Sequence, residues 1–585
     1  MAGIDRVSNS PPLYESKSHQ ILEKETAVHD DMHRKGSAVT PELLAGEIFD
    51  ERFEKTQRGL KSRHAQMIAL GGKKRLCERM ACEAVTLTIR LLGTIGTGLF
   101  VGSGQTLARG GPAFILGCYI FIAFLVYCVV TAITEVAAYL PTPGSSMNLY
   151  GYRYCSRTMG FALGWLYFYS LGILIPYEIT AAGLVIGYWN APVNIAVWIT
   201  IMIIVIVGLN TLPVAFYGET EFWFASVKVF MMLGLLILSF ILFWGGGPSH
   251  DRLGFRYWKN PGAANTYLAE GNLGRFLALL STLVLSAFPF TFAPELLVVT
   301  GGEMQSPRRN LPIAARRYFY RLVFFYIGCT LAIGVICQSN DKALTHGGAG
   351  AGSSAFVVGI KNAGIPVLDS IINAGIIISA WSSGNSFLYI SSRSLYSLAL
   401  SGSAPSFFKA CTKKGVPYRA VACSSIFTAL AYLNCGTSGS VVFNWFVNLT
   451  NTSGFISWIC CCIVYLRFRK ACIAQNVTDL PFKSWMQPWG SWCAIVGFTF
   501  LSLINGFNVF WPQNWSASSF LTAYVGIPIF LAIYFGYMLF YARGDPWFHD
   551  PMEVDLHTGM DEVLAEETPR PVYDKWYEKA RIVFE

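Results

Sequence analysis

Apolar residues along this chain occur in long runs that are separated by shorter polar segments. A helix needs roughly 20 predominantly apolar residues to cross the hydrocarbon core of a bilayer. The pattern therefore predicts an all-α membrane protein with about 12 transmembrane helices. One span is expected near residues 65–104. The other predicted spans are Pro112–Leu140, Phe161–Ile186, Asn194–Leu209, Phe222–Trp244, Phe276–Val299, Leu322–Cys337, Val367–Leu388, Ala420–Leu433, Val441–Leu466, Trp489–Phe510 and Phe520–Tyr541.

The two ends of the chain are polar and are predicted to lie outside the bilayer. Residues 1–60 are mixed in charge and lack the apolar stretch of a signal peptide, so they predict a disordered cytosolic tail. Residues 61–545 form the predicted transmembrane domain, and residues 546–585 a cytosolic C-terminal tail. The chain is 53% hydrophobic and 14% charged, whereas soluble domains carry about 25% charged residues. The predicted spans exclude a soluble enzyme. The basic residues lie in short segments between apolar runs, so the net charge does not indicate a nucleic-acid-binding protein.

Lysine and arginine are concentrated in alternate loops, which predicts the orientation of the chain. With both termini in the cytosol, the loop between residues 251 and 275 is external; it carries four cations, but its length weakens their influence. The sequon that begins at Asn514 is then also external, as N-glycosylation requires. The cytosolic loops hold Arg153, Arg157, Arg308, Arg309, Arg316, Arg317, Arg321, Lys409, Lys413, Lys414, Arg419, Arg467, Arg469 and Lys470.

A glycine-rich segment, Gly93–Phe100, lies within the first predicted span. Glycines allow the helix to unwind, and broken helices present free backbone N–H groups to a substrate carboxylate in many transporters. A nucleotide-binding loop would require a preceding strand and a following soluble helix, and neither is predicted here. Close packing of helices through small residues is the remaining alternative.

Several longer motifs resemble the fungal amino acid permease family of the amino acid–polyamine–organocation superfamily. The resemblance covers roughly residues 60–545. The motifs are His64–Gly72, Gly93–Phe100, Gly160–Trp165, Tyr217–Phe224, Gly254–Trp258, and Gly302-Glu303 before Pro307-Arg308-Arg309.

The resemblance implies a transporter fold in which ten helices form two inverted five-helix repeats, followed by two C-terminal helices. Family members typically take up amino acids together with protons, and no other cofactor is implied. For this chain we expect a location in the plasma membrane. Their substrate lies between the broken first and sixth helices. By motif, Gly96, Thr97 and Gly98 would bind the substrate carboxylate, and the stretch Phe288–Glu295 would offer carbonyl groups to the ammonium group.

The sixth-helix stretch departs from the family pattern, because Ala293 and Pro294 replace a small Gly/Ser/Thr pair that many members have. Pro294 still breaks the helix. Three phenylalanines there suggest an apolar pocket wall and a neutral substrate, although aromatic residues are also ordinary helix packing. The predicted substrate-binding side chains of this stretch are Phe288, Phe290, Thr291 and Phe292.

Four ionisable residues inside predicted spans are candidates for proton coupling, because such groups are costly in a bilayer and usually functional. Lys228 resembles the family lysine that replaces a sodium ion in sodium-driven relatives; a lysine reaching the interface is the alternative. Glu178 lies centrally in its span, whereas Glu135 and Glu295 lie nearer the ends. No metal site is predicted.

The first predicted span is interrupted by a polar segment, Lys73–Leu92. One interpretation is a genuine cytosolic segment, with Val85–Val101 as the span instead. The other, which its position inside a binding motif favours, is a retained intron, and the chain would then be an inactive mis-spliced product. An amino acid sensor on the same fold is a further alternative. Lys17, Lys24 and Lys35 are possible ubiquitin acceptors, which would make ubiquitin ligases partners of the tails.

Overall fold

The computed structural model describes residues 97–141, 146–189, 192–212, 214–292, 294–295, 297–298, 306–345, 354–412, 415–565 and 567. All of them fall within one of the chain's two compact units, Thr56–Glu585. The predicted N-terminal tail with its lysines, the segment Lys73–Leu92 and Gly96 lie outside the described residues.

Every regular element in these ranges is a helix, and each of the predicted spans after residue 104 coincides with a helix or a pair of helices. The shorter helices are α5 (Thr97–Phe100), α7 (Met147–Tyr154), α14 (Lys342–Thr345), α15 (Ala355–Asn362), α17 (Tyr418–Ser425) and α22 (Met560–Ala565). The long helices are α6 (Gly102–Tyr139), α8 (Arg157–Ile186), α9 (Ile195–Thr211), α10 (Val214–Phe243), α11 (Gly271–Ala287), α13 (Pro307–Ile336), α16 (Leu368–Leu400), α18 (Gly439–Ala474), α19 (Trp489–Ile504) and the bent pair α20–α21 (Ala517–Tyr524 and Gly526–Phe540).

Seven helices in the described ranges are long and apolar enough to cross a membrane, and the pair α20–α21 would be an eighth. The 33-residue helix α16 is not among them, because it carries many polar side chains. These side chains are buried against neighbouring helices, as Ser382, Ser383 and Asn385 show. A spanning helix in the interior of a bundle can carry such groups, since they find partners in the protein.

Two helices are broken, and the break after α11 falls in the sixth-helix stretch where the sequence predicts one. In α6, Gly111 has φ 80° and ψ 172°, so residues 102–110 and 112–139 form separate helical segments. A side chain at Gly111 would meet the Ala263 carbonyl oxygen at 2.9 Å. Helix α11 ends at Ala287, and the chain continues through a short 3₁₀ turn, Phe288–Phe290. Phe292 then adopts φ 58°, which is uncommon for a residue other than glycine.

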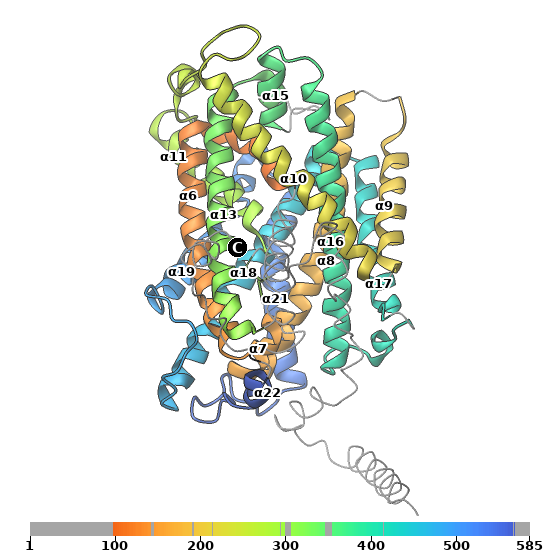
Figure 1. Ribbon diagram of the computed structural model, residues 1–585, viewed down its shortest axis with the longest axis vertical. Helices are drawn as coiled ribbons and strands as arrows, with labels where there is room; N and C mark the ends of the chain where they lie inside the picture. The colour runs from red at the N-terminus through yellow and green to blue at the C-terminus, as the bar shows by residue number, and fades with distance from the viewer. Residues whose placement is uncertain are drawn as a thin grey trace, which may run out of the picture. The chain divides into compact units, whose positions relative to one another are not determined.

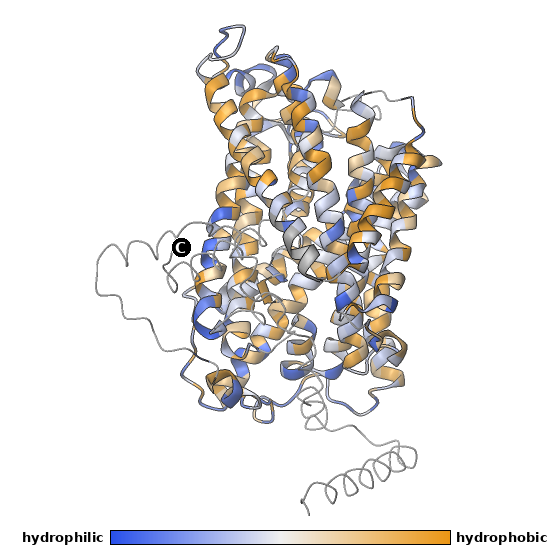
Figure 2. Ribbon diagram, turned by 45° about the vertical axis from the view of Figure 1, so that its right-hand side comes forward, coloured by the Kyte–Doolittle hydropathy of each residue, from blue (hydrophilic) through white to orange (hydrophobic). Residues whose placement is uncertain are grey.

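Helix α8 lies at the centre of the bundle and packs against α16, α18 and α7, while α6 packs against α13 and α11 (Figure 1). Gly164 permits the contact between α8 and α16, because a Cβ atom there would lie 2.3 Å from Leu398. By contrast, α9 and α10 expose residues such as Ile204 and Phe230. Figure 2 shows that most of the length of the helices is hydrophobic. Hydrophilic residues are more frequent toward the end of the bundle near α22.

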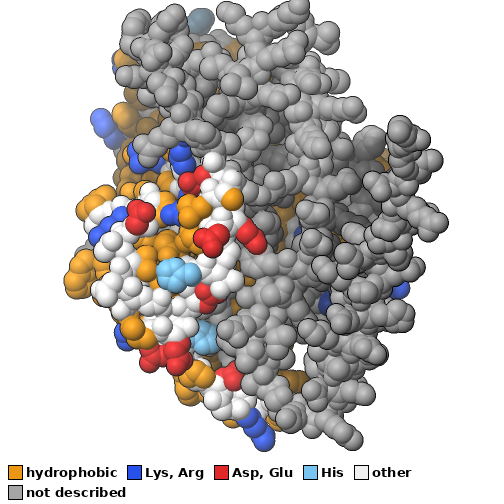
Figure 3. Space-filling view, turned by 60° about the horizontal axis from the view of Figure 1, so that its bottom comes forward, with side chains coloured by type: hydrophobic (Ala, Val, Ile, Leu, Met, Phe, Trp, Pro, Cys, Tyr) orange, Lys and Arg blue, Asp and Glu red, His pale blue; other side chains and the backbone are white. Residues whose placement is uncertain are grey.

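The chain that follows α21 packs against the end of the bundle formed by α7 and the C-terminus of α18. Arg153 donates to the Asp555 carboxylate at 2.8 Å and to its backbone oxygen at 2.8 Å. Gln475 donates to the Val554 carbonyl at 2.7 Å. Acidic, basic and histidine side chains are gathered on this face (Figure 3).

Electrostatics reinforce this contact at Asp555. Burial alone would raise the pKa of the Asp555 carboxyl, but the backbone N–H of Thr558 and the charge of Arg153 hold this pKa below its usual value. The carboxylate is therefore ionised at neutral pH, and its contribution to docking is lost only as the pH falls through that low pKa. Leu556 beside it is fully buried.

Candidate functional site: a cavity between broken helices

A small cavity lies where α5 and the break after α11 meet α8, α13 and α16. Its volume is about 20 Å³, which is room for about one water molecule. Binding of an amino acid would require the surrounding side chains to move apart. The lining residues are Gly98, Leu99, Leu174, Tyr177, Glu178, Phe288, Pro289, Thr291, Tyr326 and Phe387.

Gly98 forms one wall of the cavity and lies directly against the broken sixth helix. A Cβ atom at this position would be 3.0 Å from two ring atoms of Phe288 and 3.4 Å from the Pro289 Cα atom. Only glycine allows the two broken segments to approach this closely without displacing the ring. Gly98 and Phe288, both predicted substrate-binding residues, are thus neighbours across the cavity.

Thr97 connects the first broken helix to α8. Its fully buried hydroxyl donates to Glu178 Oε2 at 2.8 Å and lies 3.2 Å from the Tyr177 hydroxyl. The Tyr177 ring packs on Phe288, with ring centroids 4.6 Å apart. A predicted carboxylate-binding residue and a predicted proton-coupling residue are therefore in direct contact.

The other predicted residues of the sixth-helix stretch face in different directions. Thr291 lines the cavity. The Phe290 ring is fully buried and packs on Tyr326, with centroids 4.6 Å apart. Phe292 packs on Tyr167, with centroids 6.2 Å apart. Neither of these rings lines the cavity, so their environment is that of helix packing.

Lys228 is fully buried on α10, and it does not reach the end of the bundle as an interfacial lysine would. Its Nζ atom donates to Ser383 Oγ on α16 at 3.0 Å. Lys228 also interacts electrostatically with the carboxylates of Glu221 and Glu178. Glu178, which lines the cavity and accepts a hydrogen bond from Thr97, is thus close enough to Lys228 for their charges to interact.

Comparison with known proteins bears on this arrangement. Residues 85–550 match the model of the family described as amino acid permease. The proline-specific permease of Emericella nidulans is 45% identical over 89% of this chain and 92% of its own length. The proline-specific permease of Saccharomyces cerevisiae is 45% identical over 88% of this chain and 80% of its own length. The dicarboxylic amino acid permease of that yeast is 37% identical, covering 98% and 90% respectively.

This chain belongs to the amino acid permease family. It is a membrane transport protein for amino acids and not an enzyme, as the motifs predicted. The cavity described above is the candidate substrate site of this permease, because its walls come from the two broken segments.

Glu295 of the permease lies just beyond the sixth-helix break and is fixed by α18. Its Oε1 atom accepts from the Ser457 hydroxyl at 2.6 Å, and its Oε2 atom accepts from the Trp458 ring N–H at 3.3 Å. The Ser457 hydroxyl is in turn 3.1 Å from the Tyr167 hydroxyl on α8. Glu295 is buried. Through Ser457, the hydrogen bonds join the segment after the break to α18 and α8.

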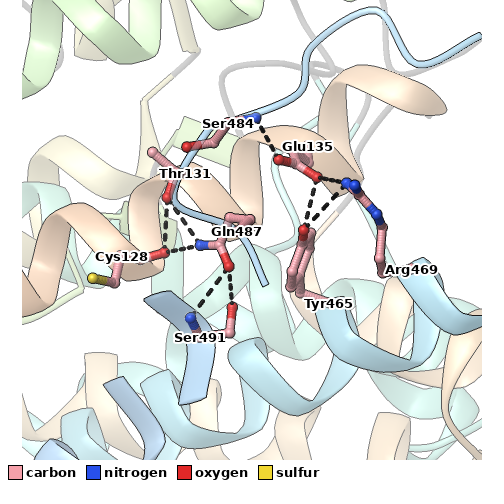
Figure 4. A network of polar contacts seen from close by, with 8 residues as sticks. All are labelled: Cys128, Thr131, Glu135, Tyr465, Arg469, Ser484, Gln487 and Ser491. Carbon is pink, nitrogen blue, oxygen red and sulfur yellow. Dashed lines mark hydrogen bonds and ion pairs between the residues drawn. The ribbon is translucent and has the colours of Figure 1, made fainter. Parts of the chain in front are cut away.

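Glu135 of the permease is held in an ion pair at the end of α6 (Figure 4). Its Oε2 atom accepts from Arg469 at 2.8 Å and from the Tyr465 hydroxyl at 2.9 Å. Its Oε1 atom accepts from the Ser484 backbone N–H at 2.6 Å. One turn away, Gln487 bridges α6 and α19. A carboxylate with this many partners has the environment of a structural anchor between helices.

Asn514 of the permease lies in a short 3₁₀ turn, Pro512–Asn514, and is exposed. Its side chain is therefore accessible to modification.

The structure also brings residues to the site that the sequence analysis did not single out. Tyr177, Tyr326 and Phe387 line the cavity, and Ser383 contacts Lys228. Tyr177 directly precedes Glu178, and Glu221 lies within the family motif Tyr217–Phe224. Both residues could therefore have been predicted from the sequence. Tyr326 occurs in an apolar run among other aromatic residues, and Phe387 follows a polar, serine-rich stretch of α16; nothing in the sequence distinguishes either as a lining residue.

Proposed function

We propose that this permease takes up neutral amino acids, with proline as the leading candidate, together with protons across the plasma membrane. The lining of the cavity is the observation that supports a neutral substrate. Among the described residues of that lining, Glu178 is the one charged side chain, and it already accepts a hydrogen bond from Thr97. The remaining lining is mainly aliphatic and aromatic, which suits an uncharged side chain.

The relatives support proline within this class. Proteins named as proline-specific permeases share 45% identity with this chain, whereas the dicarboxylic amino acid permease shares 37%. An acidic side chain would bring a negative charge next to Glu178, and like charges in a poorly solvated cavity repel strongly.

Proton coupling is proposed from the position of Lys228. A buried ammonium group that interacts with two carboxylates can lose or regain a proton when those partners move. Thr97 and Glu178 connect it to the cavity, so substrate binding and proton movement would be linked by alternating access. The polar tails are proposed to be cytosolic, with their lysines available to ubiquitin ligases.

A competition assay tests the substrate proposal. The chain is expressed, both as written and without Lys73–Leu92, in cells that lack their own proline uptake, and labelled proline is offered with a tenfold excess of each of the twenty amino acids. We expect competition by proline and small neutral amino acids, and none by aspartate, glutamate, lysine or arginine. Competition by charged amino acids that equals that of proline would contradict the proposal.

A further inference from the structure

We propose that a second cavity, near the C-terminal end of α8, binds a membrane sterol through the sterol's hydroxyl group. The cavity lies between that end of α8, the start of α9, the 3₁₀ helix Ile426–Cys435 and the start of α18. Its volume is about 300 Å³, compared with about 20 Å³ for the candidate substrate site. Ligand pockets in proteins have volumes of about 300–1,000 Å³, so this cavity is large enough for a ligand.

The walls of this cavity are mainly aliphatic, and one side of it reaches the surface that would face lipid. Leu184 and Ile195 line the interior. Val193 also lines the cavity and is 44% exposed, as is the neighbouring Val197 at 47%. Helix α9 lies at the edge of the bundle (Figure 1). In the orientation expected from the basic loops this end of α8 is external, so the cavity opens to the outer leaflet.

Two polar atoms of the lining residues are buried and have no hydrogen-bond partner among the described residues. They are the Asn434 side-chain oxygen and the Trp198 ring N–H. The orientation of the Asn434 amide is fixed, because its nitrogen donates to Thr180 Oγ1 at 2.9 Å and to the Ala431 carbonyl at 2.8 Å. The amide oxygen borders the space beside Gly439, since a Cβ atom on this glycine would lie 3.5 Å from it.

The two atoms require opposite partners, and a hydroxyl group supplies both. The Asn434 oxygen needs a donor, and the Trp198 N–H needs an acceptor; a hydroxyl donates one hydrogen bond and accepts others. No charged side chain lines the cavity among the described residues, which disfavours a phospholipid head group. A sterol combines one hydroxyl with a rigid apolar body, and the aliphatic walls suit that body.

Two glycines provide a variant that fills the cavity and its control. A Cβ atom on Gly183, which lines the cavity, would meet only the Ile195 side chain, at 3.2 Å and 3.7 Å. Gly183→Leu therefore places a side chain in the cavity. Gly208 on α9 is exposed, and a Cβ atom there would meet nothing within 4 Å. Gly208→Leu adds the same side chain outside the cavity.

Two tryptophans provide the corresponding pair for the hydrogen bond. Trp198→Phe keeps an aromatic ring in the wall and removes the N–H group. Trp445 on α18 also has a buried ring N–H without a partner among the described residues, but it does not line this cavity. Trp445→Phe therefore removes an equivalent group elsewhere in the same bundle.

Cross-linking to a photoactivatable sterol tests the proposal. The purified full chain and, in parallel, the form without Lys73–Leu92 are placed in phosphatidylcholine nanodiscs, and the labelled residues are identified by mass spectrometry. We expect labels within residues 180–198 or 431–439. Cholesterol should compete about tenfold better than the ketone made by oxidising its hydroxyl, because the ketone cannot donate to Asn434.

The variants should separate the cavity from the surrounding lipid surface. Gly183→Leu should abolish this labelling, and Trp198→Phe should weaken competition by cholesterol about tenfold. Gly208→Leu and Trp445→Phe should change neither. If Gly183→Leu does not elute as a folded protein in gel filtration, the comparison of Trp198→Phe with Trp445→Phe decides.

Labels on other residues only, equal competition by cholesterol and the ketone, or equal effects of Trp198→Phe and Trp445→Phe would overturn the inference. Labelling that persists in a folded Gly183→Leu variant would also overturn it. The absence of any label would indicate that no sterol occupies the cavity. The measurement involves no amino acid substrate, so its result is independent of the proposed transport of proline.

Discussion

Gly98 is the position where one added carbon atom should matter most for substrate binding. Its missing Cβ atom would lie 3.0 Å from the Phe288 ring and 3.4 Å from the Pro289 backbone. We expect Gly98→Ala to raise KM, because the Phe288 ring can shift. We expect Gly98→Val to abolish uptake, because overpacking costs about 1–3 kcal/mol and the cavity is already small.

Gly102 provides the comparison for this prediction. It lies one turn further along the chain, at the start of α6, and a Cβ atom there would meet nothing within 4 Å. Gly102→Ala should therefore leave KM unchanged. Concentration-dependent uptake by the three variants measures the effect. Normal KM in Gly98→Val would show that substrate binds elsewhere.

Some residues of the candidate site could be predicted from the sequence, and others could not. The motif around Gly98 and the intramembrane charges of Glu178 and Lys228 were visible as patterns, and the structure brings them to one region. Phe290 and Phe292 were indistinguishable from Phe288 in the sequence. The strained turn at Phe292 and the rings that surround each phenylalanine decide which of them lines the cavity, and such contacts depend on distant helices.

At the scale of elements, the Glu135–Arg469 pair is predicted to stabilise the contact of α6 with α18. Glu135 is almost fully buried. Removing one partner of a buried pair costs about 3–5 kcal/mol, because the other charge remains without compensation. Glu135→Gln should therefore lower the temperature of thermal unfolding in detergent, while the protein that folds still accumulates substrate.

Replacing both partners separates this structural role from proton coupling. A Glu135→Leu, Arg469→Leu double variant should be more stable than Glu135→Gln, since no unpaired charge is left. A stable Glu135→Gln variant that transports without proton coupling would contradict the structural role and support a relay.

The helices themselves could be predicted from apolar runs. A segment that crosses the hydrocarbon core must be apolar and must satisfy its backbone hydrogen bonds within its own helix. The polar helix α16 was predicted only over its apolar part, Val367–Leu388, whereas the helix extends from Leu368 to Leu400. Likewise α13 begins at Pro307, well before the apolar run. Polar and basic helix ends leave no apolar signal, so their extent depends on packing and on the loops beyond them.

For the whole molecule, the segment Lys73–Leu92 is predicted to impair transport. It carries five Lys or Arg and two Glu residues. A cation at the centre of a spanning helix costs roughly 2.5–3.5 kcal/mol, so the segment must be expelled from the hydrocarbon core. The motif His64–Gly72, which is expected in the same span as Gly93–Phe100, would then be displaced from it. Deleting the segment should restore uptake.

Sequencing the transcript across codons 70–95, together with uptake by the two forms, measures this effect. A transcript that lacks codons 73–92, together with an active deletion form, would agree with a retained intron. A transcript that retains them, with equal transport by both forms, would show that the segment is a genuine part of the protein.

We propose that a proton gradient drives uptake of a neutral amino acid through Lys228. The direct measurement is accumulation of labelled proline in proteoliposomes that contain the purified permease without Lys73–Leu92 and, in parallel, the full chain, without sodium and with the external pH lower than the internal pH. We predict accumulation that a protonophore abolishes, and none in Lys228→Met, which keeps the length of the side chain but loses its charge. Accumulation that follows a sodium gradient and ignores pH would contradict the account.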